Sequence, residues 1–249
     1  MAAQAGKRGV FYKISGIPEK ESSIFFDEFN ILSKTIDSVN NLRLLYKTGR
    51  TGARGGPSTH DQQDLYRAML VFACAGLDVF VKQLVKNKLP DLLEVDMVVQ
   101  GEFKEYVRKG ALKDKEKMIN IVALALIDQA PRSVFLSEYM KRLTGDSLQS
   151  VSQLLQIAKA SGLEKEKIYT EIKNNAIKEA FEVRNQIVHE MDINVIKDSS
   201  RNTGFRTRRQ RRAPIMEKHA KSILKLAEGL LLAYKEKFYM YQIGVVKGR

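Results

Sequence analysis

The stretch Ala68-Met69-Leu70-Val71-Phe72-Ala73-Cys74-Ala75-Gly76-Leu77 decides the fold of this chain. It is apolar on every side of a helix, and a helix that is hydrophobic all round belongs in a protein core. We therefore expect it to form the centre of the most buried helix. That helix should begin after an N-cap at Ser58 or Thr59 and run to about Asn87, because Pro90 signals a stop.

Three further segments repeat apolar residues at spacings of three and four, which is the period of an amphipathic helix. They predict a first long helix over about 19–47, a third over about 164–191 and a last over about 214–242. Pro214 suits the first helical position of the last one, where its missing N–H costs nothing. Between the first two helices, the glycine-rich segment 48–57 is typical of a plain connection and lacks the Gly-Lys-Ser or Gly-Lys-Thr ending of a phosphate-binding loop.

Segment 91–163 has a shorter and less regular apolar pattern. It predicts smaller helices near 97–109, 113–128, 132–143 and 147–160, separated at glycines and a proline. The chain is therefore predicted to be all-α, a bundle of four long helices with a smaller helical insertion between the second and the third.

In domain terms, the sequence predicts one helical domain over 19–243, preceded by an N-terminal arm over 1–18 and followed by a tail over 244–249. The insertion occupies 91–163. Residues 194–213 are expected to be a basic loop, because they contain an Asp-Ser-Ser run and a glycine and no helical period.

The formal net charge of +13 points to a polyanionic partner, because a basic surface attracts phosphate backbones and releases their counterions. The positive charge is concentrated within the predicted loop, where six arginines occur between positions 201 and 212 without an acidic residue. These candidate RNA-binding residues are Arg201, Arg206, Arg208, Arg209, Arg211 and Arg212. Phe205 offers a stacking face among them. The alternative, a mobile solvated loop, stays equally open.

Composition also bears on disulfides, metal sites and the cellular compartment of this chain. The single cysteine, Cys74, rules out an internal disulfide or a multi-cysteine metal site and suits a reducing compartment. The three histidines lack metal-ligand spacing, so no metal and no cofactor is expected. The longest apolar run, 68–81, is interrupted by Asp78 and the first residues lack an apolar signal core, so we expect a cytoplasmic protein without a membrane span.

The candidate chemistry lies in Phe181-Glu182-Val183-Arg184-Asn185-Gln186-Ile187-Val188-His189-Glu190, near the end of the third predicted helix. Arg184, Asn185 and His189 form the pattern Arg-Asn-x-x-x-His, and histidine is the side-chain type best suited to proton transfer near neutral pH. On a straight helix, residues five apart are separated by about 140° and roughly 7.5 Å along the axis. Arg184 and His189 therefore do not share one face of the helix, whereas Asn185 and His189 do.

This pattern, in a basic and helical chain, resembles the signature of the HEPN family, whose active members are metal-independent endoribonucleases. The segment Asp64 to Val81 is similar to the second helix of the ribonuclease-L-type, defence-associated subgroup, in which an arginine opens an apolar run ending in Leu-Asp. Here those residues are Arg67 and Leu77-Asp78. The resemblance covers the two motif helices and, by inference, the bundle core, but not the insertion.

The resemblance implies a homodimer in which both motifs line one cleft, and RNA as the substrate. His189 is then the general base and acid, Arg184 stabilises charge on the phosphorane, and Asn185 positions the phosphate or the imidazole. The implied product carries a 2′,3′-cyclic phosphate, so DNA is inert. Glu190 and Asp78 are supporting candidates, although Asp78 is equally suited to pair with Lys82, four residues on.

The resemblance further implies a toxin or antiviral defence effector, controlled by an antitoxin or a defence-complex partner protein. Each catalytic residue has a structural alternative: His189 as a helix cap and Arg184 as half of an ion pair with another helix. Two whole-protein alternatives also stay open. One is a non-catalytic HEPN-type module that holds RNA or nucleotide, and the other is a helical scaffold that docks a protein on 91–163.

Overall fold

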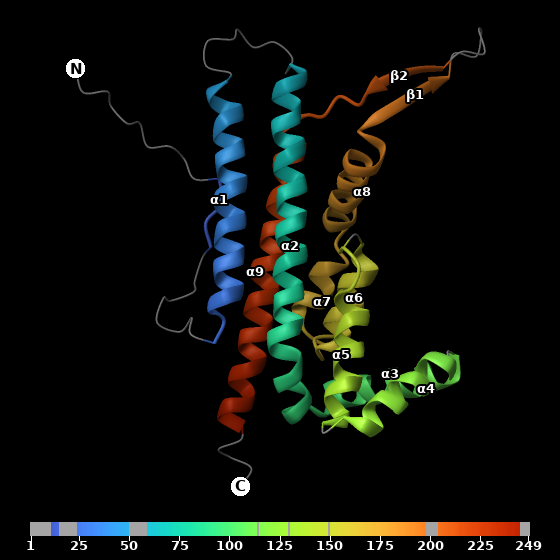
Figure 1. Ribbon diagram of the computed structural model, residues 1–249. Helices are drawn as coiled ribbons and strands as arrows, with labels where there is room; N and C mark the ends of the chain where they lie inside the picture. Colours follow the sequence, from blue (N-terminus) through green and yellow to red (C-terminus); the bar gives the residue numbers. More distant parts are fainter. Residues whose placement is uncertain are drawn as a thin grey trace. The chain divides into compact units, whose positions relative to one another are not determined.

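The computed structural model describes residues 11–14, 24–49, 59–113, 115–128, 130–148, 150–197 and 204–244. The secondary structure of these residues is helical apart from one hairpin, and the predicted all-α class is confirmed. Figure 1 shows the elements α1 (Phe26–Thr48), α2 (His60–Val95), α3 (Met97–Lys113), α4 (Lys115–Ile127), α5 (Pro131–Thr144), α6 (Val151–Ala160), α7 (Lys167–Ile172), α8 (Asn175–Glu190), β1 (Ile193–Lys197), β2 (Gly204–Arg208) and α9 (Ala213–Gly244).

The chain forms two compact units. The first consists of 1–77 and 175–228, and so holds α1, α8, the hairpin and the first halves of α2 and α9. The second consists of 78–174 and 229–249, and it contains the whole of the predicted insertion 91–163. The motif residues Arg184 to His189 therefore belong to the first unit.

The core of the first unit is built from the apolar stripes that the sequence shows. α1 buries Leu32, Ile36 and Val39, and α2 and α9 supply the aliphatic residues opposite them. The predicted N-cap is confirmed at Thr59, since its hydroxyl accepts from the Gln62 amide at 3.3 Å and the Gln62 side chain accepts from the Thr59 amide at 3.1 Å. This reciprocal pair is a capping box.

The centre of α2 is buried on most of its circumference but not on all of it. Met69, Leu70 and Ala73 are fully buried, whereas Phe72 is 52% exposed. Ala75 is exposed as well, so this apolar stretch is not enclosed on every side. By length and composition α2 is also the one helix in the described ranges that is apolar enough to cross a membrane, and half of that apolar window is buried in the structure.

Residues 11–14 pack on the first unit without forming a strand. The Tyr12 amide donates to the Asn40 side chain at 3.2 Å, and the Asn40 amide group returns a hydrogen bond to the Tyr12 carbonyl at 3.0 Å. The Tyr12 hydroxyl donates to Glu228 of α9, and burial together with this carboxylate raises the pKa of Tyr12. The remainder of the predicted arm 1–18 lies outside the described residues.

The predicted end of the second helix near Asn87 is wrong, because α2 continues through Pro90 to Val95. A proline inside a helix removes one hydrogen bond and crowds the preceding turn. Here Leu89, Leu92 and Leu93 around it are fully buried, so packing outweighs that cost. α3 then begins at Met97, directly after Asp96, whose carboxylate accepts from the Val98 amide at 2.7 Å.

The predicted third helix over 164–191 is wrong as a single element, because the chain breaks between α7 and α8. The amides of Lys173 and Asn174 bond to carbonyls three residues back, at 3.2 and 3.1 Å, which tightens and ends α7. Asparagine at 174 and 175 is a weak helix former. The apolar period runs across this break because Ile172 and Ala176 keep the spacing of four.

The predicted basic loop 194–213 is also corrected, because most of its described part is an antiparallel hairpin. β1 pairs with β2 in the register that sets Ile193 opposite Arg208 and Lys197 opposite Gly204. β-branched residues such as Val195, Ile196 and Thr207 favour strands. The Asp-Ser-Ser run that suggested a loop falls in 198–203, between the strands and outside the described residues.

The smaller helices of the insertion are found close to their predicted ranges, as α3 to α6. Two polar contacts join the described parts of the second unit. The Lys237 ammonium lies 2.5 Å from Asp96 and donates to the Gly162 carbonyl at 2.8 Å. Gly162 has a φ of +67°, and a Cβ there would lie 2.4 Å from the Lys237 nitrogen, so only glycine suits this position.

The close approach of α1 and α2 at Gly76 gives a test of the packing. An alanine Cβ at 76 would lie 2.2 Å from both terminal atoms of Thr35 and 2.7 Å from its Cβ, so rotating Thr35 does not relieve the clash. Overpacking costs about 1–3 kcal/mol, more than the helix propensity that alanine gains over glycine. We expect Gly76→Ala to be destabilised by roughly that amount in urea unfolding. The double variant Thr35→Ala/Gly76→Ala should recover most of the loss, and a Gly76→Ala protein as stable as its parent would contradict the packing.

Candidate active site

The motif occupies the C-terminal half of α8. The N-terminal half of this helix is held in the core of the first unit by Ile177, Ala180 and Phe181. Toward its end the helix emerges, so that Arg184 and Asn185 are half-buried and His189 is exposed. The structure thus places an anchored arginine and a solvent-accessible imidazole on one helix.

Arg184 retains donor capacity that described residues do not use. Its Nη1 donates to the Asn185 side-chain oxygen at 2.9 Å, while its Nε is buried without a hydrogen-bond partner in the described ranges. No carboxylate of a described residue pairs with Arg184, so the ion pair considered as its structural role is not formed there. A buried, unsatisfied guanidinium N–H costs free energy unless a ligand or water meets it.

The charge of Arg184 also affects the pKa of a thiol in the core. Burial raises the pKa of the Cys74 thiol to about 12, and the positive charge of Arg184 works in the opposite direction. Cys74 is therefore a neutral, buried thiol rather than a nucleophile.

His189 lies on the last turn of α8 between exposed apolar side chains. Val188 is 40% exposed and Met191 is 64% exposed. The next residue, Glu190, pairs with Arg209 of the segment before α9 at 3.2 Å. Arg209 has one further nitrogen, Nη1, that is buried without a partner in the described part of the chain.

The backbone reverses directly after α8 through two residues of left-handed conformation, Met191 with a φ of 51° and Asp192 with a φ of 55°. This conformation costs an ordinary L-residue roughly 1–2 kcal/mol, with asparagine and aspartate as the usual exceptions. The amide of Asp192 donates back to the Gln186 carbonyl at 2.9 Å. A sharp, locally unfavourable turn therefore follows the helix, which ends at Glu190, one residue after His189.

The Asp192 carboxylate holds this turn in place. It is fully buried and receives Arg67 Nε on one oxygen at 2.7 Å and Arg211 Nη2 on the other at 2.6 Å. Burial acts to raise the pKa of Asp192, but the hydrogen bonds from Arg211 and Arg67 outweigh it and hold that pKa below its usual range. We call Asp192, Arg67 and Arg211 the arginine clamp.

The arginine clamp extends to three segments of the first unit. Arg67 of α2 donates to the Arg209 carbonyl at 2.6 Å, and Arg211 donates to the Gln186 side chain of α8 at 2.7 Å. The Tyr66 hydroxyl of α2 donates to the Arg211 carbonyl at 3.0 Å. The clamp thereby fixes the end of α8 against α2 and the start of α9.

The arginines predicted to bind RNA are divided among different environments. Arg201 lies outside the described residues, and Arg206 is on β2 with its side chain not described. Arg208 pairs with Asp64 at 2.9 Å, and Arg209 and Arg211 are engaged as above. Arg212 is exposed and has no ion pair with a described residue. Their binding of RNA stays a prediction.

Asp78 belongs to the second unit and has two partners there. Its carboxylate pairs with Lys82 at 3.1 Å and accepts from the Leu148 amide at 3.0 Å. The predicted pairing with Lys82 is confirmed, whereas support of Arg184 by Asp78 stays a prediction.

Sequence reasoning missed Asp192 and Gln186, and it noted Arg67 only as part of the second motif. A signal was present for Asp192, an acidic residue three positions after the motif histidine. Its partners are far along the chain, however, and nothing local identifies them. No group of histidine, cysteine and acidic residues in the described ranges is arranged to hold a metal ion.

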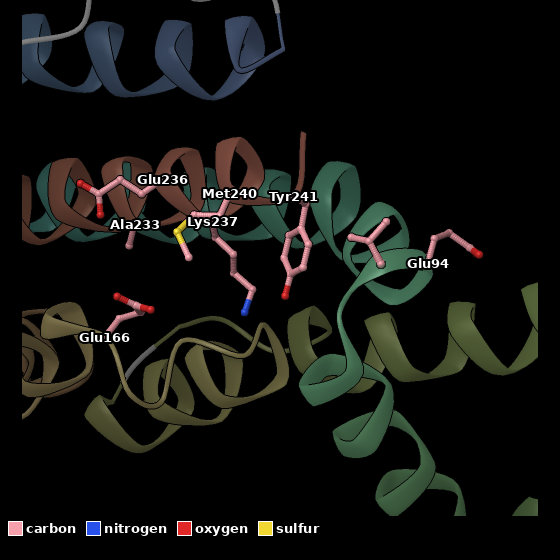
Figure 2. A pocket seen from close by; sticks show the side chains of 8 residues that line it. Glu94, Glu166, Ala233, Glu236, Lys237, Met240 and Tyr241 are labelled. Carbon is pink, nitrogen blue, oxygen red and sulfur yellow. The ribbon is translucent and has the colours of Figure 1, made fainter. Parts of the chain in front are cut away.

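The second unit has a cavity of about 700 Å³ near the end of α9, and Figure 2 shows its lining. Glu94, Glu166 and Glu236 supply carboxylates, and Lys237 is committed to Asp96 and Gly162. None of the predicted site residues lines this cavity, and its acidic walls do not suit a polyanion.

The arginine clamp gives a stability prediction. Asp192→Asn leaves Arg67 and Arg211 facing a neutral group, and breaking a buried ion pair costs about 3–5 kcal/mol. Asp64→Asn is the matched control, because Asp64 pairs with Arg67 and Arg208 but is 47% exposed. Exposed pairs contribute about 0–1 kcal/mol. Urea unfolding should separate the two variants, and equal losses would show that the clamp does not stabilise the fold.

His219 gives a prediction of pH dependence. It is buried on α9, and burial lowers its pKa, with Glu179 of α8 opposing the shift and Lys218 and Arg211 adding to it. The unfolded chain therefore binds a proton below about pH 6.5 that the folded chain does not bind, so stability falls as the pH drops below that value. His219→Gln should flatten this part of a stability profile between pH 5 and 8. His60→Gln, an exposed histidine at the start of α2, should leave it unchanged; the same slope in all three proteins would sink the assignment.

The comparison with known families agrees with the residue pattern. The model of the RiboL-PSP-HEPN family matches residues 27–203, a span that contains α2 to α8 and nearly all of α1. No curated protein matches the chain, and no solved structure matches it. The family suggests a function related to ribonuclease activity or defence. With most of its length matched, this chain belongs to the RiboL-PSP-HEPN family.

Proposed function

We propose that this protein is a metal-independent endoribonuclease that cleaves RNA by attack of the ribose 2′-hydroxyl and leaves a 2′,3′-cyclic phosphate. One observation carries the proposal: Arg184 presents a buried N–H without a described partner, on the same helix as the exposed His189. A phosphate is a ligand that meets such a donor, since a guanidinium binds phosphoryl oxygens strongly.

The proposed reaction needs a base, an acid and a stabiliser of negative charge. A neutral His189 takes the proton of the 2′-hydroxyl, and an imidazolium protonates the departing 5′-oxygen. Arg184 stabilises the charge that develops on the phosphorane. Asn185 accepts a hydrogen bond from Arg184 and so orients the guanidinium, and Glu190 supports the site by holding Arg209.

A second copy of the chain completes the proposed site. Arg184 and His189 are five residues apart on α8, so they diverge by about 140° around the helix axis. Two antiparallel copies of α8 would bring the arginine of one protomer toward the histidine of the other. Val188 and Met191, exposed apolar residues on either side of His189, suit the contact surface of such a homodimer.

Membership of the family also supports a proposal for the biological role of the protein. We infer a cytoplasmic toxin or antiviral defence effector that acts on RNA and is restrained by an antitoxin or by a partner in a defence complex. The scaffold alternative is favoured by one feature of the insertion: on α4, Leu126 and Ile127 are 80% and 82% exposed. A non-catalytic RNA-binding module is the remaining alternative, and it predicts binding without cleavage.

The decisive experiment is cleavage of end-labelled RNA in excess EDTA. The wild type should generate cyclic-phosphate ends, and His189→Ala and Arg184→Ala should each lower the rate by about 10²-fold or more. His60→Ala, an exposed histidine at the start of α2, serves as the control and should cleave normally. Equal rates in all four proteins would refute the site, and intact RNA binding without cleavage would favour the binding module.

The same cleavage assay also tests whether the proposed site is shared between two protomers. An equimolar, refolded mixture of Arg184→Ala and His189→Ala contains heterodimers with one intact arginine–histidine combination. The mixture should therefore recover part of the wild-type rate, although each variant alone is slower by about 10²-fold or more. No recovery would place both residues of one site in the same protomer.

A further inference from the structure

A basic groove lies on the first unit, and none of the predicted RNA-binding arginines whose side chains the structure describes lines it. It encloses about 540 Å³, and its charged lining comes from Arg43 and Lys47 on α1 and from Lys218 and Lys221 on α9. Phe11 lies among these side chains. We call this site the α1–α9 groove.

The ring of Phe11 organises two of the cations. The Arg43 guanidinium carbon lies 4.7 Å from the ring centroid, and the Lys221 nitrogen lies 5.9 Å from it. A cation over an aromatic face is attracted by the ring quadrupole, which restricts the long side chain at little desolvation cost. The phenylalanine thus concentrates positive charge that would otherwise spread over the surface.

The groove carries an excess of positive charge. Glu217 is its one carboxylate, and it pairs with Arg43 at 2.9 Å. Lys47, Lys218 and Lys221 are exposed and have no carboxylate partner among the described residues. Three like charges around one hollow repel each other, and an anion that bridges them relieves this repulsion.

The groove lies at the amino end of α9, which adds to its positive electrostatic potential. Pro214 lines the groove and lies in the first turn of this 32-residue helix, which has no acidic residue in that turn. The amino end of a helix carries a partial positive charge that favours anions. The first turn of α1, by contrast, contains Asp27 and Glu28.

We propose that the α1–α9 groove binds the phosphodiester backbone of a single RNA strand, as a second point of attachment for the RNA that the proposed function takes as substrate. The choice of RNA rests on the proposed function, while the recognition of phosphate rests on the groove itself. Contacts to phosphate position a strand without reading its bases, so the groove does not select a sequence. Arg208, Arg209 and Arg211 are held in intramolecular ion pairs, which leaves these lysines as the more available cations.

Fluorescence anisotropy with a labelled 12-nucleotide RNA tests this, in the His189→Ala background so that the probe stays intact. The test variant is Lys47→Glu/Lys221→Glu, with one substitution on each helix. Its matched control is Lys34→Glu/Lys225→Glu, which changes exposed lysines of the same helices outside the groove and gives the same net charge. Circular dichroism checks that both fold.

The groove variant should bind RNA roughly tenfold more weakly than the control variant. Its plot of log K against log salt concentration should also be less steep, by about 1.4, because each single-strand phosphate contact contributes about 0.7 to the slope and two contacts are lost. Equal affinities of the two variants would overturn the proposal. Two equally reduced affinities would mean that net charge explains the effect, and two intact affinities would mean that the groove does not contribute to binding.

Single-stranded DNA of the same length separates this inference from the proposed function. A backbone site binds DNA as well, so the groove variant should lose DNA affinity to a similar extent. DNA should nevertheless not be cleaved, because it lacks the 2′-hydroxyl. Cleavage is measured separately, with His189 intact. A protein that binds RNA and DNA through the groove but then cleaves neither would disprove the ribonuclease while leaving the groove intact. Binding of RNA alone, lost in the groove variant, would overturn the backbone mode.

Discussion

The buried carboxylate of Asp192 is the constraint on which the first unit depends. It sits in a left-handed turn that the chain would otherwise avoid, and two arginines from segments far apart in the sequence converge on it. Neither arginine is easily buried alone, and the carboxylate is not easily buried without them. The three charges are therefore mutually required. Because the turn follows α8 directly, the position of His189 depends on α2 and on the chain before α9.

The ion pairs of the first unit divide its basic residues into those that pair with the protein's own carboxylates and those that do not. A sequence with six arginines in twelve residues suggests a polyanion-binding surface, but three of those arginines satisfy carboxylates of the protein itself. Net charge describes the long-range attraction of a polyanion and does not identify the side chains that contact it. The unsatisfied Nε of Arg184 and the unpaired lysines of the α1–α9 groove are better indicators, because they are donors that the described residues leave unused.

Local signals predicted the helical class, the capping box at Thr59 and the small helices of the insertion, since period, cap and turn chemistry are short-range properties. They failed where long-range packing decides. Pro90 is retained within α2 because the leucines around it are buried, and the break after Ile172 leaves the apolar period intact. At the site, the motif identified Arg184 and His189. The partners Arg67 and Asp192 are 125 residues apart, so no pattern in the sequence relates them.

The geometry of α8 also limits how the proposed catalytic roles can be divided between two protomers. A single helix cannot bring Arg184 and His189 together without distortion, and the turn after Glu190 comes too late to bend the intervening residues. The arginine clamp, moreover, holds the helix end rigidly and so opposes such a distortion within one protomer. A site assembled from two copies requires no deformation, only the contact of two exposed helix ends that carry Val188 and Met191. In the proposed homodimer, the helix end held by the arginine clamp is the surface that meets the second copy.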